Sequence, residues 1–253
     1  MRGCLDFLLR VGDKRAEELR DKFIFKIIPI INPDGVIRGH YRTDARGQNL
    51  NRHYSTPDSQ LQPQCFAYRQ MVKYFANAYK TDENGQTTDA TEQEDVQETT
   101  NSGVAFMIDL HAHAAKRGCF LYGNRLKTSR LHAEMLLYAR LTSANSAFMD
   151  FDACCFSQRN MTLKEKRDEN LSKEGSARVA LYYLTGTPHI YTLECNYNTG
   201  KFMNSISSGR SGAITPPLST MPNLKYGPNG EFIDYDRILM FSKNTPKLAV
   251  GCW

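Results

Sequence analysis

The chain has 253 residues, a net charge of +5 and 41% hydrophobic residues. A single α/β domain of this length is routine, and no apolar run is long enough to predict a membrane-spanning helix. The seven cysteines include no CxxC pair, which argues against a structural zinc knot and is typical of reduced thiols in the cytosol.

The N-terminal part predicts a helix, a strand and a second helix. Leu5–Leu19 has an amphipathic pattern. Phe23–Ile31 is nearly all apolar, which predicts a strand covered on both faces, with Pro29 marking its end or a bulge. A tight turn follows the strand, and Gln64–Lys80 predicts the next helix. Leu5–Leu9 is too short an apolar core for a signal peptide.

An acidic segment follows at residues 81–102, which hold seven acids and no base. Because it has almost no large apolar side chains, it cannot bury enough surface to offset its ordering entropy, and we predict a disordered surface insertion. Without these seven acids the net charge rises from +5 to +12. The folded body is therefore basic, which favours an acidic partner over a neutral one.

The second half alternates between strand and helix patterns. The predicted strands are Val104–Leu110, Cys119–Tyr122 and Pro188–Glu194, and the predicted helices are Ser129–Leu141 and Gly175–Leu184. Asp234–Phe241 suggests a last helix. This order predicts an α/β fold with a mixed, largely parallel sheet and helices on both faces. Such sheets bind ligands beyond the carboxyl ends of their strands, where His111 and Glu194 fall.

Arginine and asparagine side chains gather after the first predicted strand. Asn32-Pro33-Asp34-Gly35 is followed by Arg42 and then by Asn51-Arg52. The planar fork of arginine grips a carboxylate through two parallel, charge-assisted hydrogen bonds. The alternative for each of these residues is a solvated loop position, but the group predicts a substrate that ends in a carboxylate.

Three ordered segments carry a family resemblance. Asn32–Arg52, Asp109–Cys119 and Tyr191–Asn198 together resemble the zinc carboxypeptidases of the carboxypeptidase A clan. Within the clan they resemble the cytosolic carboxypeptidases, which trim glutamates from tubulin, and most of all the type-five enzymes, which remove branch-point glutamates. The resemblance spans roughly residues 1–212 and implies that the whole chain, 1–253, is one carboxypeptidase-like catalytic domain.

The resemblance also implies roles for the site residues. His111 would bind zinc, and Glu194 would be the general base. Arg42 would stabilise the oxyanion, and Asn51 with Arg52 would clamp the terminal carboxylate. Arg178 lies near the position that selects the terminal residue, where a cation would favour glutamate. The alternatives are a histidine hydrogen-bonded at a loop entrance, a glutamate paired structurally with an arginine, and a surface salt bridge at Arg178; His113 is a neighbour of the site.

The first metal motif of the family, His-x-x-Glu, is absent. None of the six histidines has a glutamate three positions later. The resemblance places this motif just upstream of Met1, so the chain is expected to be an N-terminally truncated version. Two of the three ligands of its single zinc ion would then lie outside the chain. Because one imidazole cannot hold zinc tightly, the activity of the chain itself is in doubt.

Three functions therefore stay open. The first is a zinc metallocarboxypeptidase that removes glutamate, including branch-point glutamate, from tubulin tails or other acidic C-terminal peptides. The second is a truncated, inactive module that binds such tails. The third is a zinc amidohydrolase of small acylated amino acids, which the amino-acid sequence of Arg38–Arg52 disfavours. We expect a cytoplasmic protein, in some settings on microtubules or in the nucleus, with no nucleic-acid or membrane partner.

Overall fold

The computed structural model describes residues 1–78, 98, 102–164, 171–197, 200 and 247–252. The predicted helix Asp234–Phe241 lies outside these residues, as does most of the acidic segment 81–102. Two residues of that segment are described. The Glu98 carboxylate accepts hydrogen bonds from Thr128 N and Tyr182 Oη, both at 2.7 Å, and Ser102 is buried.

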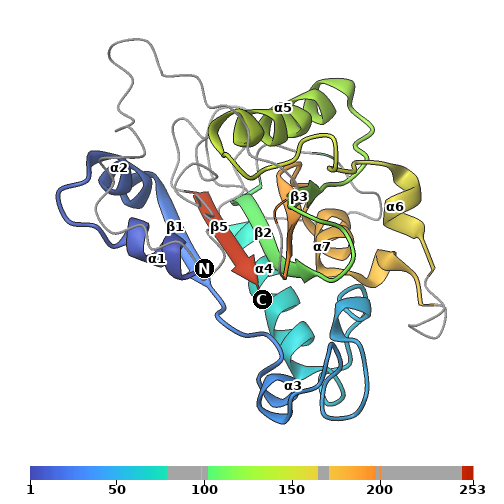
Figure 1. Cartoon of the computed structure of the whole chain (residues 1–253). Helices are drawn as coiled ribbons and strands as arrows, with labels where there is room; N and C mark the ends of the chain where they lie inside the picture. Colours follow the sequence, from blue (N-terminus) through green and yellow to red (C-terminus); the bar gives the residue numbers. More distant parts are fainter. Residues whose placement is uncertain (79–97, 99–101, 165–170, 198–199, 201–246, 253) are drawn as a thin grey trace.

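A five-stranded sheet forms the centre of the molecule (Figure 1). Its order is β1-β5-β2-β4-β3, with bounds Phe23–Ile27, Lys247–Cys252, Val104–His113, Ile190–Asn196 and Cys119–Tyr122. All neighbouring pairs are parallel except β3 and β4. The mixed, largely parallel sheet predicted from the sequence is confirmed.

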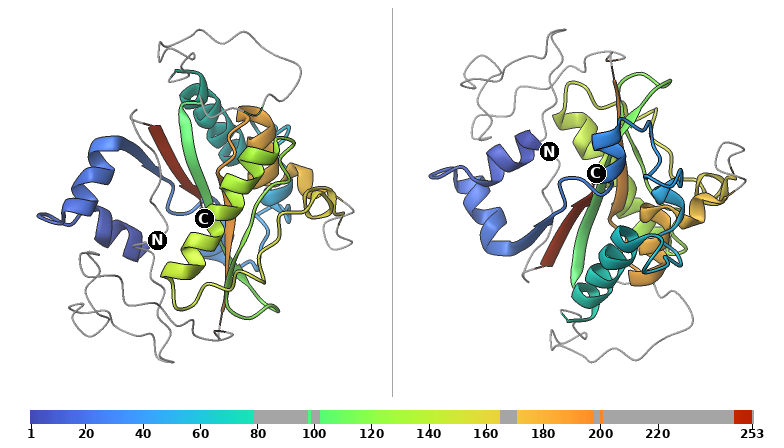
Figure 2. Two further views of the ribbon diagram at one scale, coloured as in Figure 1. Left: turned by 90° about the horizontal axis from the view of Figure 1, so that it is seen from above. Right: turned by 90° about the horizontal axis from the view of Figure 1, so that it is seen from below.

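Helices lie on both faces of the sheet (Figure 2). The helices are α1 Arg2–Leu8, α2 Lys14–Lys22, α3 Pro33–Arg38, α4 Pro63–Ala78, α5 Ser129–Asn145, α6 Gln158–Thr162 and α7 Ala177–Thr185, with 3-10 turns η1 Leu50–Arg52 and η3 Lys173–Gly175. α4 packs with α7 on one face, and α5 covers the other. There Tyr138 of α5 lies 5.2 Å from the Phe106 ring and 4.8 Å from the Tyr191 ring, centroid to centroid. Among the described helices, none is both long and apolar enough to cross a membrane.

The predicted helix Leu5–Leu19 is in fact two helices, α1 and α2. Gly12 between them has φ +79°, a conformation that glycine adopts without the steric cost borne by other residues. The Asp13 side chain then caps α2 by accepting from Arg15 N at 3.1 Å. The hydrogen bonds from the Arg15 side chain lower the pKa of Asp13 to about 2. The amphipathic pattern continues across this break, which is why the sequence suggested one helix.

The first strand is shorter and more exposed than predicted. It ends at Ile27 rather than Ile31, and Ile24 and Ile27 are 39% and 37% exposed. Because of this exposure, the prediction of a strand covered on both faces is wrong. The one neighbour of β1 in the described sheet is β5, so β1 is an edge strand there. The turn that follows contains α3, which begins where the Asn32 side chain accepts a hydrogen bond from Gly35 N at 3.1 Å.

A close approach of two backbones holds the loop that carries Asn51 and Arg52. Tyr54 N donates to Gly175 O at 2.9 Å, which ties the segment after η1 to η3. A Cβ atom on Gly175 would lie 2.0 Å from Arg52 O. The two turns can therefore touch only because residue 175 has no side chain.

We expect Gly175→Ala to destabilise the fold, because the added methyl group must push η1 away from η3. Overpacking of this kind costs about 1–3 kcal/mol, which lowers the melting temperature of a domain of this size by several degrees. Circular dichroism melting measures the change. Gly200→Ala, where a Cβ meets nothing within 4 Å, is the matched control. Equal melting temperatures for the two variants would contradict the argument.

Candidate functional site

The site forms at the carboxyl ends of β2 and β4. The parallel register sets His111 opposite Glu194, and Asp109 opposite Thr192. Two strands separated by about 80 residues in the chain therefore place an imidazole and a carboxylate next to each other. The placement at strand ends is the one that the sequence predicted for His111 and Glu194.

Glu194 is 8% exposed. Burial raises the pKa of its carboxyl group, and Asp109 adds to this, while the charges of His111, Lys173 and Arg178 partly offset the rise. A carboxylate with a raised pKa is a better proton acceptor at neutral pH than an ordinary glutamate. The environment of Glu194 thus suits proton transfer.

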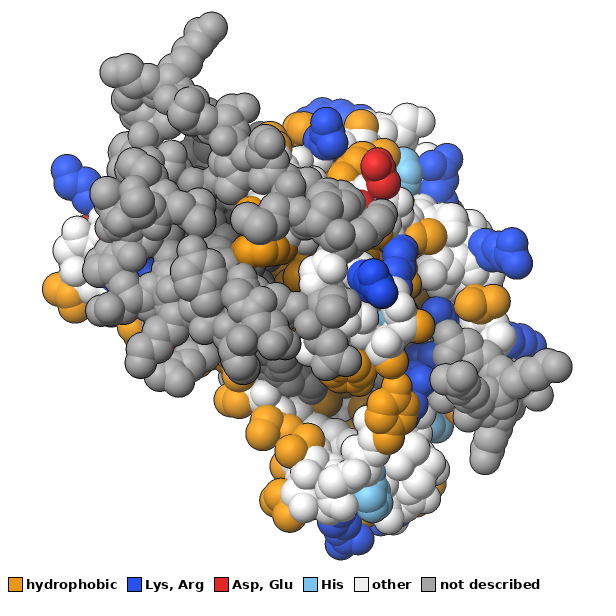
Figure 3. Space-filling view, in the orientation of Figure 1, with side chains coloured by type: hydrophobic (Ala, Val, Ile, Leu, Met, Phe, Trp, Pro, Cys, Tyr) orange, Lys and Arg blue, Asp and Glu red, His pale blue; other side chains and the backbone are white. Residues whose placement is uncertain are grey.

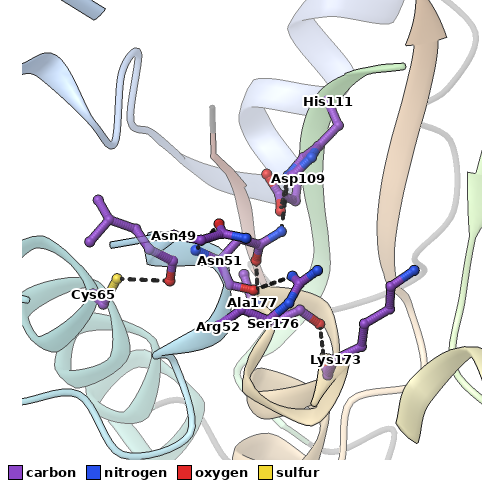
Figure 4. A network of polar contacts seen from close by, with 10 residues as sticks. Asn49, Asn51, Arg52, Cys65, Asp109, His111, Lys173, Ser176 and Ala177 are labelled. Atoms are coloured by element: carbon purple, nitrogen blue, oxygen red, sulfur yellow. Dashed lines mark hydrogen bonds and ion pairs between the residues drawn. The ribbon is translucent and has the colours of Figure 1, made fainter. Parts of the chain in front are cut away.

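His111 forms an ion pair with Asp109, with 2.7 Å between Nε2 and Oδ2. Burial disfavours its charge, but Asp109 and Glu194 outweigh that effect and raise the pKa of His111 to about 9. The two carboxylates thus favour the protonated form of this imidazole. Its ring nitrogen faces the Asp109 carboxylate, so the histidine is held in a fixed orientation (Figure 4).

Asn51 links η1 to both His111 and α7 (Figure 4). Its Nδ2 lies 3.4 Å from His111 Nε2, and its Oδ1 accepts a hydrogen bond from Ala177 N at 2.9 Å. Arg52 is buried, and its Nη1 donates to Asn51 O at 2.7 Å. The structure thus brings Asn51 and Arg52 to the same site as His111.

Arg178 of α7 is buried and is not a surface residue. It is 3% exposed. Its Nη1 donates to Gly123 O and to Asn124 Oδ1, and its Nη2 donates to Asn160 Oδ1 at 2.8 Å. Burial lowers the pKa of Arg178 to about 10, and Asp109 and Glu194 are among the acidic groups that oppose this. Its partners among the described residues are neutral oxygens, so the surface salt bridge considered from the sequence is wrong.

Arg42 lies on the exposed loop after α3, within electrostatic reach of the site. Its charge lowers the pKa of both His111 and Tyr197. Tyr197, three residues after Glu194, hydrogen-bonds with Tyr41, and burial followed by these interactions raises its pKa. Neither Tyr197 nor Lys173 was predicted from the sequence to be a site residue. Tyr197 follows directly after the strand that contains Glu194, and this position in the sequence could have identified it as a site residue.

His113 faces the loop between β2 and β3. Its Nδ1 accepts hydrogen bonds from Lys116 N at 2.8 Å and Ala115 N at 3.2 Å, and its ring packs against Phe120. This histidine therefore stabilises the loop beside the site.

A catalytic zinc ion usually has three protein ligands. The described residues contain no group of three or more His, Cys, Asp or Glu side chains that could hold a metal ion. His111 alone, with Nε2 turned to Asp109, does not meet that requirement. The described residues alone therefore do not fit a catalytic zinc centre.

One face of the described surface carries mainly basic charged side chains. On the face seen in Figure 3, Lys and Arg side chains are scattered over the surface and far exceed Asp and Glu. This distribution agrees with the excess of Lys and Arg, 32, over Asp and Glu, 27, in the whole chain. Such a surface attracts acidic molecules.

Several curated proteins are similar to this chain. The rat cytosolic carboxypeptidase-like protein 5 is 39% identical over 287 residues, which is 87% of this chain and 34% of the relative. The human protein of the same name is 38% identical and covers 85% of the chain and 32% of the relative. Mouse cytosolic carboxypeptidase 4 is 30% identical over 78% of the chain and 16% of the relative. The chain thus spans about a third of the length of the type 5 relatives.

Solved structures agree with the fold. A putative carboxypeptidase A from Shewanella denitrificans matches with a TM-score of 0.53 and 23% identity, over 77% of this chain and 43% of that protein. A metallo-carboxypeptidase from Burkholderia cenocepacia matches with a TM-score of 0.55 and 20% identity, over 77% and 42%. At this level of identity the matches show that the fold is shared.

The family follows from a match that covers most of the chain. The sequence model described as zinc carboxypeptidase matches residues 1–203. This range includes the strands, loops and helix that carry His111, Glu194, Asn51, Arg52 and Arg178. The chain belongs to the zinc carboxypeptidase family, with the shared fold and a site at the carboxyl ends of β2 and β4.

Proposed function

We propose that this polypeptide belongs to a cytoplasmic metallocarboxypeptidase that releases glutamate from acidic C-terminal tails, with glutamylated tubulin as the substrate class. The observation that carries the proposal is the buried Arg178 guanidinium, close enough to Glu194 to lower the pKa of that carboxyl group. A fixed cation near the catalytic residues of a carboxypeptidase favours a terminal residue with an acidic side chain. The names of the similar cytosolic carboxypeptidases support the location.

In this proposal each residue has a separate task. Asn51 and Arg52 hold the terminal carboxylate, and Arg178 binds the glutamate side chain. Hydrogen bonds to Gly123, Asn124 and Asn160 use three of the five N–H donors of Arg178, so the other two have no partner among the described residues. Glu194 accepts a proton from the attacking water and returns it to the leaving amine, while Arg42 stabilises the oxyanion.

The cofactor is part of the proposal. We propose one zinc ion, with His111 as a ligand and the remaining ligands on a His-x-x-Glu segment that these 253 residues do not contain. Because the described residues do not complete a metal centre, a second function has support: a module that binds acidic tails without cleaving them. Arg52 and Arg178 are held by protein contacts that need no metal, so binding could persist without hydrolysis.

Zinc content and glutamate release distinguish these two functions. Elemental analysis is made on the purified 253-residue chain and on a version lengthened at its N-terminal side with the His-x-x-Glu segment of a type 5 relative. We expect stoichiometric zinc and release of glutamate from acidic peptides in the lengthened version alone. Peptide binding without release in both versions would favour the binding module. Neither binding nor release in either version would reject both functions.

We expect Arg178→Gln to remove the preference for a terminal glutamate. A hydrogen bond to a charged group contributes about 1.5–3 kcal/mol, so the chain should bind a peptide ending in glutamate roughly 10- to 100-fold more tightly than one ending in glutamine. Fluorescence anisotropy with the two peptides measures this ratio, which the variant should bring close to one. Arg125→Gln, at an exposed position on the adjoining loop, is the matched control. A ratio unchanged in Arg178→Gln would show that another residue selects the terminal side chain.

The proton on His111 gives a further prediction, since a metal ligand must lose it. We expect Asp109→Asn to lower the pKa of His111 from about 9 toward 6.5 or below, because burial is then opposed mainly by Glu194. NMR titration of the imidazole resonance measures the pKa. Asp152→Asn, at an exposed position, is the control. A pKa that stays near 9 would contradict the role of Asp109.

The same pair predicts the pH dependence of folding. The pKa of His111 is raised in the folded state, so its contribution to stability is present below pH 6.5 and is lost as the pH rises through about 9. Melting temperatures of the wild type should therefore fall between these pH values by more than those of Asp109→Asn.

A further inference from the structure

Two thiols face each other on the antiparallel strands β3 and β4. Cys119 is paired with Cys195 in the sheet register, and their Sγ atoms are 3.1 Å apart. The next pair in the register is Phe120 with Glu194. Both cysteines are in the thiol form, so they make a dithiol beside the candidate general base.

The geometry of the sheet suits a bond between them. Asn196 N donates to Gly118 O at 3.0 Å, so the hydrogen-bonded pair is Gly118 with Asn196, and Cys119 with Cys195 is the adjacent non-hydrogen-bonded pair. Opposed residues in such pairs have Cα atoms about 4.5 Å apart, within the range of about 4.4–6.8 Å found in disulfides. The sulfurs can therefore join without movement of either strand.

Two other cysteines near the sheet, Cys65 and Cys154, have thiols with raised pKa values. Cys65 is fully buried, donates to Leu50 O at 3.5 Å, and burial raises its pKa to about 12. Burial also raises the pKa of Cys154 to about 11, and its Sγ accepts from Leu121 N at 3.2 Å. Because the thiolate is the reactive form, both thiols resist oxidation.

We propose that Cys119 and Cys195 are a modification site: a dithiol that hydrogen peroxide closes into a reversible disulfide. Cys195 is half-buried and Cys119 is 8% exposed, so peroxide meets the Cys195 sulfur first. The Cys195 sulfur takes one peroxide oxygen to become a sulfenic acid, and one water is released. The Cys119 sulfur then attacks it, an S–S bond forms, and the sulfenic oxygen leaves as a second water. Peroxide takes up the two electrons that the thiols lose.

The bond would lock the edge of the sheet next to Glu194. It joins residues 76 positions apart in the chain, so it restricts the unfolded state strongly. A dithiol reductant restores both thiols by exchange. This inference stands apart from the proposed function, because it concerns the thiols of the folded chain and holds with or without hydrolysis.

The test uses the full chain treated with hydrogen peroxide, blocked with an alkylating agent and digested with trypsin without reduction. Trypsin places Cys119 in peptide 118–125, Cys195 in peptide 179–201, and Cys154 with Cys155 in peptide 141–159. Mass spectrometry should find 118–125 linked to 179–201, and dithiothreitol should separate them. The melting temperature of the oxidised chain should rise by about 5 °C or more and return on reduction.

Variants separate this bond from others. Cys195→Ser and Cys119→Ser should each lose the linked peptides and the rise in melting temperature, while Cys65→Ser should keep both. If the wild-type chain gives no link between 118–125 and 179–201, or links 141–159 equally well, the proposal is overturned. Oxidation of Cys195 to a sulfinic acid with Cys119 left as a thiol would overturn it too. The peptide map of the wild type decides the question even if a variant fails to fold.

Discussion

The parallel pairing of β2 with β4 is the constraint on which the site depends. It sets the partly buried His111 beside the buried Glu194 and near the buried Asp109, so that two carboxylates with little access to water lie beside one imidazole. The negative charges of the two carboxylates are offset by positive charges on His111, Lys173 and Arg178. Removing water from charges is costly, and their mutual arrangement has to offset that cost. The register of one strand pair therefore fixes both the geometry and the charge balance.

The remaining site residues are attached to this pair through backbone contacts. The loop with Asn51 and Arg52 reaches the sheet because Gly175 lets η3 approach Arg52 closely. Asn51 then contacts His111 on β2 and Ala177 on α7 with the two atoms of one side-chain amide. A displacement of η3 would thus move the residues at the ends of β2 and β4, although η3 itself contains none of the residues proposed to act in catalysis.

The sequence predicted best where apolar runs are continuous. The predicted strands Val104–Leu110 and Pro188–Glu194 correspond to β2 and β4. These strands are largely buried on both faces, so each has a continuous apolar run that is easily recognised as a strand. It failed where a local backbone conformation decides, as at Gly12, and where an edge strand is apolar, as at β1. No prediction was made for β5. The nearness of Cys119 to Cys195 and the burial of Arg178 depend on strand register and helix packing, which the order of residues alone does not reveal.

The anchoring of Arg178 has a consequence for recognition. A main-chain carbonyl and the side-chain amides of Asn124 and Asn160 hold the guanidinium in one place before any ligand arrives. An arginine on a flexible loop loses rotamer freedom when it grips an anion, and that loss subtracts from affinity. Here the loss has already occurred during folding. Selection between ligand side chains at this position would therefore depend on how well each one replaces the water around rigidly held N–H donors. A side chain that fits poorly would lose more binding free energy here than it would beside a mobile cation.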